Sequence, residues 1–563
     1  MGKDSVIFYR EWDKDRNRAW SKLGGSRKLD LPTLLSKRSQ KVDVRDQHFS
    51  LAEWYDLIES CLRGDVTEPI VNLRDSDGEF DAIFIGGGAG GRFGAAYLRA
   101  MGGRPLLVDS WPFLGGSCPH QACVPHHVFS DVAAELDLWR WFSGELFFPE
   151  WDPSRVKILD IVNLFRRGRS LAHAFMNWQT KEQLEAEYVL NASARALDEH
   201  TVEVAGRTFT TRNIVIGMGA TPRPPDIPGI DLPGVFDFAT LVEDLDYEPT
   251  RCVVVGGGKT SLEYGSFFHA TGCQTTIVSR SPLMRTPSLH HVDEDLRRYV
   301  VNGMVARGVE VLEGASPIEI KGSDRVERVT IQLEDGQTVE IETDFVFLGT
   351  GEVPNSRAAW EWLGVEVGSK GEIVVDRSMR TSVPGVYAIG DIIGPPMEMF
   401  KARKCGITAA KNIMGDSAEF DFSEYPDFLH TTYEVTWLGL SEVEARERYE
   451  NIIIIQMPPY VEGLDTDHLP LPCAERTMLY AFAKPELSGF QKLVVDADSR
   501  RVLGAHHVGY GAKDAFQYLD YLVHRPEGLT IDDLGNMNEL FLNPEHFIQL
   551  SRLRAGRSEL VSL

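Results

Sequence analysis

The hydrophobic and polar positions of residues 1–78 predict little regular structure apart from one helix. This part of the chain is rich in charged side chains and lacks the alternation of a strand. Ser50 and Glu53 have the spacing of a capping box, and Gly64 is suited to end a helix. Between them, these apolar side chains recur at helical spacing: Leu51, Trp54, Tyr55, Ile58, Cys61 and Leu62. We therefore expect an N-terminal helical extension that packs on the main body.

From Phe80 onward, short apolar runs alternate with helical segments. The run at 81–85 is a strand that leads directly into glycines, and a second strand–glycine–helix unit starts at Arg251. Two such units predict an α/β protein with two doubly wound, Rossmann-like dinucleotide-binding domains. From about residue 426, hairpin-like strands are followed by helices, which predicts a separate C-terminal α+β domain.

Composition and charge exclude several classes of protein. Of 563 residues, 43% are hydrophobic and 25% are charged, as in soluble globular proteins. No apolar run approaches the roughly 20 residues of a membrane span. The 58 basic and 83 acidic residues give a net charge of −25, which disfavours nucleic-acid binding. The N-terminus has no signal-peptide pattern and seven cysteines do not suggest a secreted disulfide framework, so we expect a cytoplasmic protein without membrane association.

The first glycine-rich turn has the spacing of a nucleotide site. Gly86, Gly88 and Gly91 fit G-x-G-x-x-G directly after a strand, so the backbone can approach a pyrophosphate at a helix N-terminus. About 20 residues later the next strand ends in Asp109, an acid suited to a ribose hydroxyl. The strand, turn, helix and acid together predict a nucleotide site rather than a purely structural turn.

The second glycine-rich turn departs from this pattern at two points. Gly256 and Gly258 are present, but Ser261 replaces the third glycine. The expected acid after the next strand is missing, and Arg280 and later Arg285 stand there. An arginine can pair with a 2′-phosphate, which favours NADPH over NADH, although a solvated arginine is the alternative.

A third signal is a strand that ends in Gly390 and Asp391. Its carboxylate is placed to bond a ribitol hydroxyl of FAD. By itself this is only a strand that leads into a turn, and its order after two dinucleotide sites supports the functional interpretation.

Cys118 and Cys123 are the candidate reactive centre. Four residues separate them, so they can meet across one distorted helical turn, close to a flavin held by the first dinucleotide fold. A zinc site is the main rival because His120, His126 and His127 lie nearby, but a second ligand pair at zinc-finger spacing is missing. Two inert buried cysteines are the other alternative. We predict a redox-active pair and no metal.

These motifs in this order resemble the pyridine nucleotide-disulfide oxidoreductases over about residues 80–563. Within that family, five segments are similar to the 2-ketopropyl coenzyme M oxidoreductase/carboxylases: Gly90–Gly94, Cys118–His127, Met399–Lys404, Phe541–Phe547 and Ser551–Gly556. The resemblance implies FAD and NADPH as cofactors, and a homodimer. It also implies an FAD-binding domain 79–221 continued by 346–425, an NADPH-binding domain 222–345 and a dimerisation domain 426–563. The N-terminal helical extension 1–78 precedes these domains and is longer than the family needs.

The resemblance also implies an activity. Those enzymes cleave the thioether of 2-ketopropyl coenzyme M reductively and carboxylate the released enolate with CO2 to acetoacetate. Cys118 is then the outer nucleophile and Cys123 the flavin-proximal thiolate that resolves the mixed disulfide. The resemblance implies that Arg92 and Arg403 clamp the sulfonate. It implies that His546, Gln549 and His173 polarise the ketone, and that Met176 is a wall of the substrate channel. Glu263 would lie near the nicotinamide, and Lys259 would be a gating residue.

The usual proton donor of the family is replaced in this sequence. Ordinary disulfide reductases place a histidine, and a glutamate five residues later, where this chain has Phe541 and His546. His126 stands at a position that is usually lysine. Without an acid, a carbanion equivalent can survive until CO2 arrives, and a phenylalanine also excludes water. The segment usually completes the partner subunit's site, so we expect an inactive monomer.

Other readings stay open. An ordinary NADPH-dependent disulfide or mercuric reductase needs a histidine at 541. A thioether reductase that protonates its product would use Glu545, beside His546. A flavoprotein that senses redox state or serves as a structural partner is the non-enzymatic alternative, and the intact cysteine pair argues against it.

Overall fold

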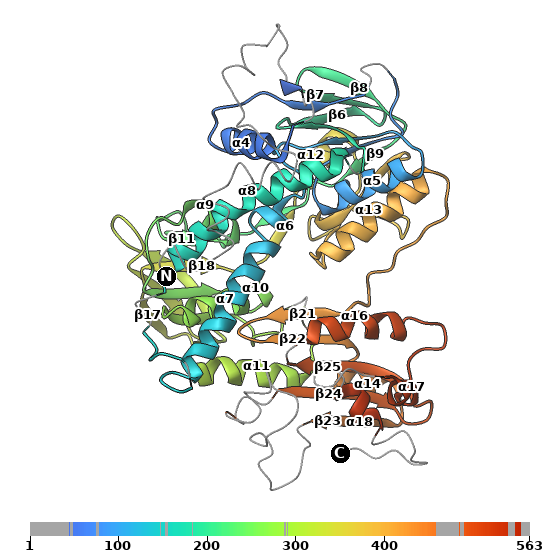
Figure 1. The fold of residues 1–563 in the computed structure, drawn as a ribbon. Helices are drawn as coiled ribbons and strands as arrows, with labels where there is room; N and C mark the ends of the chain where they lie inside the picture. The colour runs from blue at the N-terminus through green and yellow to red at the C-terminus, as the bar shows by residue number, and fades with distance from the viewer. Residues whose placement is uncertain are drawn as a thin grey trace. The chain divides into compact units, whose positions relative to one another are not determined.

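A seven-stranded, mostly parallel sheet forms the centre of the first of two structural units (Figure 1). The computed structural model describes residues 44–45, 49–74, 78–146, 148–152, 156–182, 184–286, 289, 291–457, 484, 489–509, 511–538 and 546–552. The first unit falls within 1–125, 162–223 and 352–422, and the second within 126–161, 224–351 and 423–563. Among the described helices, none combines the length and apolar character that a membrane span requires.

The strands of the first sheet are short, and its central ones are wholly buried, as expected for a parallel sheet covered on both faces. In spatial order they are β1 (Val44–Arg45), β2 (Ile70–Asn72), β5 (Glu187–Leu190), β4 (Pro105–Val108), β3 (Ala82–Ile85), β9 (Ile214–Ile216) and β20 (Val386–Ala388). Only the β2–β5 pair is antiparallel. This is the first of the two predicted Rossmann-like sheets.

The N-terminal segment contains the predicted helix and two strands that were not expected. Helix α4 (Leu51–Leu62) has the predicted capping box between Ser50 and Glu53. Trp54, Leu57 and Ile58 are fully buried and join the apolar core of the first unit. The expectation that this segment lacks strands is wrong, because β1 and β2 extend the sheet of the first unit. Strands of two and three residues are too short to show alternation.

Four helices carry several candidate site residues of the first unit. Helices α5 (Ala89–Ala100) and α13 (Met399–Ile413) lie side by side in Figure 1. They approach closely at glycines, since a Cβ atom on Gly406 would lie 2.1 Å from the carbonyl oxygen of Gly90. The others are α6 (Ser117–His120) and α8 (Ile158–Glu182).

Smaller elements complete the first unit. A three-stranded antiparallel sheet consists of β6 (Ala194–Asp198), β7 (Thr201–Val204) and β8 (Arg207–Thr210). The others are the antiparallel pair β10 (Ala220–Pro222) and β19 (Glu352–Pro354), helix α12 (Arg357–Leu363) and the 3₁₀ helix η2 (Gly390–Ile393).

The second unit contains the second predicted parallel sheet. In spatial order its strands are β11 (Val235–Phe236), β18 (Phe345–Leu348), β12 (Arg251–Val255), β13 (Gln274–Ser279) and β14 (Glu310–Glu313). Its helices are α9 (Phe238–Asp244), α10 (Lys259–Ala270) and α11 (Glu294–Arg307). An antiparallel sheet of β15 (Ser316–Lys321), β16 (Arg328–Gln332) and β17 (Thr338–Glu342) is added.

The C-terminal part of the second unit is the predicted α+β domain, and its five strands form one antiparallel sheet. They are, in order, β21 (Asp427–His430), β22 (Glu434–Gly439), β25 (Val502–Val508), β24 (Phe490–Asp496) and β23 (Ile452–Met457). The helices are α14 (Glu442–Arg448), α16 (Ala512–Val523), α17 (Ile531–Asn536) and α18 (His546–Arg552). The predicted fold class is confirmed.

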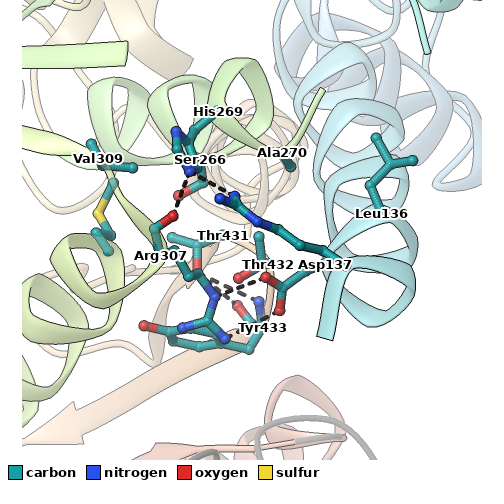
Figure 2. A pocket seen from close by; sticks show the side chains of 12 residues that line it. Leu136, Asp137, Ser266, His269, Ala270, Arg307, Val309, Thr431, Thr432 and Tyr433 are labelled. Atoms are coloured by element: carbon teal, nitrogen blue, oxygen red, sulfur yellow. Dashed lines mark hydrogen bonds and ion pairs between the residues drawn. The ribbon is translucent and has the colours of Figure 1, made fainter. Parts of the chain in front are cut away.

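A buried ion pair ties helix α7 (Cys123–Trp141) to α11 within the second unit. Arg307 donates to both carboxylate oxygens of Asp137, at 2.9 and 3.1 Å. The pair borders a cavity that His269 and Tyr433 also line (Figure 2). A cavity of about 10 Å³ holds no more than a single water molecule, so it is not a substrate pocket.

Candidate active site

The first glycine-rich turn has the geometry of a phosphate-binding turn. Gly86 follows β3 with φ of +110°, a conformation that L side chains rarely adopt. A Cβ atom on Gly91 would lie 2.0 Å from the carbonyl oxygen of Gly86, so helix and strand need glycine there. Gly88 is the N-cap of α5 without a side-chain cap, and a Cβ on it would meet nothing closer than 3.9 Å. No side chain therefore caps the amides at this helix N-terminus, as a phosphate-binding turn requires.

The two carboxylates predicted for this nucleotide site lie in the same unit. Asp109 accepts hydrogen bonds from the amide of Gly87 at 2.6 Å and that of Trp111 at 2.8 Å. Burial raises the pKa of Asp109 to about 6, against those bonds. Burial also raises the pKa of Asp391 in η2 to about 6, and the nearby charge of the buried Lys401 opposes that rise. An uncapped helix N-terminus with Asp109 at its glycine turn, and Asp391 in the same unit, fits a flavin dinucleotide.

The second turn repeats this arrangement with one substitution. Gly256 has φ of +133°, and Gly258 is the N-cap of α10, again without a side-chain cap. A Cβ on Gly257 would lie 2.4 Å from Oγ of Ser279, where Asp109 Oδ2 lies 3.1 Å from a Cβ on Gly87. Ser279 therefore occupies the position of the missing acid.

Ser261 fits where the third glycine was expected because a neighbouring residue is also glycine. Its Oγ donates to the carbonyl oxygen of Gly349 at 3.3 Å. A Cβ on Gly349 would lie only 2.2 Å from Oγ of Ser261. The serine is thus accommodated between strand and helix, and the N-terminus of α10 stays open.

The two arginines predicted to select NADPH differ in their surroundings. Arg285 donates to the carbonyl oxygen of Val292 at 2.8 Å and forms an ion pair with Glu294. Arg280 follows β13, is exposed, and has no hydrogen-bond or ion-pair partner among the described residues. Arg280 is therefore the better placed of the two to meet a 2′-phosphate.

Glu263 and Lys259 of α10 are both engaged within the second unit. Lys259 forms an ion pair with Asp427 at 2.6 Å. Glu263 lies 3.3 Å from Nδ1 of His126 and accepts a hydrogen bond from the amide of His430 at 3.0 Å. Burial alone would raise the pKa of Glu263, but the hydrogen bond and charge of His126 lower it. The sequence indicated Glu263 and His126 separately, not their pairing.

Cys118 and Cys123 are free thiols joined by a hydrogen bond. That bond from Cys123 is the main reason why the pKa of Cys118 is lowered, and the positive charge of Arg403 acts in the same direction. The bond and burial raise the pKa of Cys123. In this reduced form the pKa of Cys118 is therefore the lower of the two, whereas the resemblance implied Cys123 as the flavin-proximal thiolate, a role that stays a prediction. Among the described residues, no three His, Cys, Asp or Glu side chains converge to hold a metal.

Helix α13 brings two further side chains to Cys118. Sδ of Met399 lies 3.4 Å from Sγ of Cys118. Arg403, one turn later, stacks over Phe93 with its guanidinium carbon 4.7 Å from the ring centroid. Nε of Arg403 is buried and has no hydrogen-bond partner among the described residues.

Arg92 lies over the same ring, so the two predicted sulfonate clamps are neighbours. Its guanidinium carbon is 5.7 Å from the centroid of Phe93. Burial, and then the charge of Arg403, lower the pKa of Arg92. Arg92 donates to Oγ1 of Thr180 at 2.7 Å and to Oε1 of Gln179 at 2.5 Å. Two guanidinium groups therefore meet without a carboxylate partner within the part of the chain that is described.

Helix α8 places His173 and Met176 on the same side as Thr180. Nε2 of His173 lies 3.1 Å from Nδ1 of His120, and the fully buried His173 ring stacks on Phe113 at 3.8 Å. Sδ of Met176 would be 2.8 Å from a Cβ on Gly115, so Met176 lies against the turn before Cys118. Met176 therefore packs beside the turn that leads to Cys118, whereas the Nε2 atom of His173 faces His120.

The C-terminal candidates are placed only in part. Phe541 and Glu545 lie outside the described residues. His546 and Gln549 belong to α18, but their side chains lie outside the description as well. Their roles stay predictions.

Comparison with known proteins decides the family. Residues 80–406 match the family described as pyridine nucleotide-disulphide oxidoreductase, and residues 425–547 match its dimerisation domain. The chain belongs to this family. It is therefore a flavin-dependent oxidoreductase of a family whose members use FAD and NAD(P)H.

Several relatives and solved structures are similar over most of the chain. A mercuric reductase of Bacillus cereus is 26% identical, with 94% of this chain and 79% of the relative covered. A dihydrolipoyl dehydrogenase of Thermus scotoductus is 28% identical, with 81% of this chain and 93% of the relative covered. A HOCl-induced flavoprotein disulfide reductase of Escherichia coli has a TM-score of 0.69 at 19% identity, with 85% of this chain and 100% of that chain covered. At that identity, the likeness shows the fold alone.

Proposed function

We propose that this oxidoreductase catalyses the NADPH- and FAD-dependent cleavage of 2-ketopropyl coenzyme M with carboxylation of the product to acetoacetate. The observation that carries the proposal is the pair Arg92 and Arg403 beside a Cys118 whose pKa is lowered. Two guanidinium groups without a carboxylate partner among the described residues suit a multi-oxygen anion such as a sulfonate. A Hg²⁺ cation gains nothing from them.

The proposed chemistry begins at the charged thiol. The Cys118 thiolate attacks the thioether sulfur, so an S–S bond forms, the carbon–sulfur bond breaks, and the electron pair leaves with the ketone fragment as an enolate. The enolate carbon adds to CO2 and gives acetoacetate. Cys123, once deprotonated, attacks the Cys118 sulfur and releases coenzyme M as a thiolate, which leaves the Cys118–Cys123 disulfide. Each turnover therefore consumes two electrons.

Bound FAD supplies those two electrons to the disulfide from NADPH. Gly86, Gly88 and Gly91, with Asp109 and Asp391, would hold it in the first unit. Gly256 and Gly258 would hold NADPH, and Arg280 would pair with its 2′-phosphate. Glu263 with His126, and Lys259, would border the nicotinamide.

The chain would also keep proton donors away from the enolate. Met399 contacts Cys118 through a thioether, which carries no acidic proton. Phe541 stands where ordinary reductases of the family have the histidine donor. His546, with Gln549 and His173, would stabilise the enolate oxygen. We expect a homodimer, since the C-terminal segment matches the dimerisation domain.

The deciding assay supplies NADPH, 2-ketopropyl coenzyme M and labelled bicarbonate without oxygen. We expect labelled acetoacetate, and Phe541→His should shift the product toward acetone because it restores a proton donor. Acetone alone from the unaltered enzyme would contradict carboxylation and support a protonating thioether reductase. An unchanged product ratio in Phe541→His would contradict the role of the missing acid.

A disulfide or mercuric reductase is the second candidate. The similarity to mercuric reductases and the intact cysteine pair favour it. It predicts rapid NADPH oxidation with a small disulfide or with Hg(II), and neither acetone nor acetoacetate from 2-ketopropyl coenzyme M.

A further inference from the structure

Arg92 is held by two neutral side chains of α8, although a buried guanidinium is usually paired with a carboxylate. Thr180, fully buried, accepts from Nε at 2.7 Å, and Gln179 accepts from Nη2 at 2.5 Å. Arg92 itself is 8% exposed. The choice of a hydroxyl and an amide as partners therefore needs a physical reason.

The hydrogen bonds of Thr180 fix the direction in which it can act. Its hydroxyl donates its only proton to the carbonyl oxygen of Met176 at 2.7 Å. Only lone pairs are left for Arg92, so Thr180 must accept. With the side-chain oxygen Oε1 of Gln179, it bonds one edge of the flat guanidinium and sets its plane. The Nη1 donors of Arg92 have no partner among the described residues.

A carboxylate at either position would make the same hydrogen bonds but would also cancel the charge of Arg92. The neutral partners leave that charge in place, even though Arg403 repels it. The arrangement costs free energy in the absence of an anion, and a bound anion recovers it.

We propose that Gln179 and Thr180 are positioning residues, which orient Arg92 through neutral acceptors so that its charge stays available to the anionic end of the substrate. The inference rests on the proposed function only for the identity of that end, a sulfonate. If so, this face of α8 contributes to the preference of the enzyme for an anionic substrate.

The test measures how fast reduced, FAD-loaded enzyme reacts at Cys118 with three methanethiosulfonates, in a Cys123→Ser background that traps the adduct. The reagents carry a 2-sulfonatoethyl, a methyl or a 2-trimethylammonioethyl group. In each reaction the Cys118 thiolate attacks the sulfenyl sulfur, a disulfide forms and methanesulfinate leaves. The anionic reagent produces the mixed disulfide with coenzyme M itself. Mass spectrometry locates the adduct and gives the rate constants.

We expect the parent to react faster with the anionic reagent than with the neutral and cationic ones. Gln179→Glu should lower the ratio of anionic to neutral rates on the order of tenfold, the size of one charge-assisted contact. Thr180→Val should lower the ratio, and Thr180→Ser, which keeps the hydroxyl, should not. An unchanged ratio in Gln179→Glu, or no anionic preference in the parent, would overturn the proposal.

Flavin absorbance and thermal unfolding show whether each variant is folded. If Gln179→Glu does not fold, Thr180→Val against Thr180→Ser decides the question. The reagents report on charge without any carboxylation step. If the unaltered enzyme makes no product from 2-ketopropyl coenzyme M, but the variants lose the anionic preference of the parent, the proposed function would be overturned and the positioning role would still be supported.

Discussion

Single residues around Cys118 shift the pKa values of the two thiols in opposite directions. Cys123 donates a hydrogen bond to Cys118, and Arg403 adds a positive charge on the same side. Both lower the pKa of Cys118 and so increase its thiolate fraction at neutral pH. This direction favours Cys118 as the nucleophile of the proposed reaction.

The pH dependence of alkylation tests this assignment. In Cys123→Ala, the largest cause of the lowered Cys118 pKa is gone, so the midpoint for iodoacetamide alkylation of Cys118 should move to higher pH. Arg403→Met should move it in the same direction by less. Peptide mass spectrometry locates the adduct. A midpoint that stays or falls in Cys123→Ala would mean that another group stabilises the thiolate.

Sequence reasoning found the residues that stand in motifs and missed those that support them. Cys118, Arg92 and Arg403 belong to recognisable segments, whereas Thr180 and Gln179 act only through contacts made by the fold. One signal was available: His173, Met176 and Thr180 follow the i, i+3, i+7 spacing of one helical face. Spacing, however, does not reveal which side chain the face meets.

At the scale of elements, each glycine turn connects a strand to a helix with an open N-terminus. Gly86 and Gly256 both have a positive φ, +110° and +133°, and neither following helix has a side-chain cap. The sequence predicted both turns because backbone geometry demands glycine there. It did not predict how Ser261 fits, since the compensating residue, Gly349, is 88 positions away.

That compensation gives a stability prediction. Gly349→Ala would place a Cβ 2.2 Å from Oγ of Ser261. We expect overpacking of about 1–3 kcal/mol in the free energy of unfolding, measured with urea. Ser261→Gly removes the obstructing hydroxyl, so the double variant should recover most of the loss. A double variant as unstable as Gly349→Ala alone would place the strain elsewhere.

At the scale of the whole molecule, the sequence predicted the fold class and the order of the dinucleotide sites. It predicted less well where the chain adds strands, because β1 and β2 extend a sheet from a segment with no periodic pattern. Long-range pairing of such short segments depends on the finished sheet and leaves no local signal.

Buried charges in the two units should also give opposite pH dependences. Asp293 of the second unit lies 3.0 Å from Lys492, which also pairs with Asp295 at 2.7 Å and Glu442 at 2.8 Å. Burial alone would raise the pKa of Asp293, but the charges of His506 and Lys492, with hydrogen bonds, hold it at about 2. In the first unit, burial raises the pKa of Asp109 and Asp391 to about 6.

The sign differs between the two cases. A depressed carboxylate pKa stabilises the fold above the ordinary value of 3.8, and this contribution is lost as pH falls toward about 2. A raised carboxylate pKa favours the fold below 3.8, and that contribution is lost as pH rises through about 6. Without cofactor, the stability of the second unit should therefore decrease as the pH is lowered below about 4. The stability of the first unit should decrease as the pH is raised from about 4 to about 6.

Urea unfolding of the cofactor-free protein across this range checks both contributions. Asp293→Asn should be less stable at pH 7 and show a flatter loss below pH 4, because its contribution is already absent. Asp391→Asn should flatten the dependence between pH 4 and 6. If Asp293→Asn keeps the full acid loss, the Lys492 cluster is not its source, and the surface carboxylates of a chain with a net charge of −25 become the better explanation.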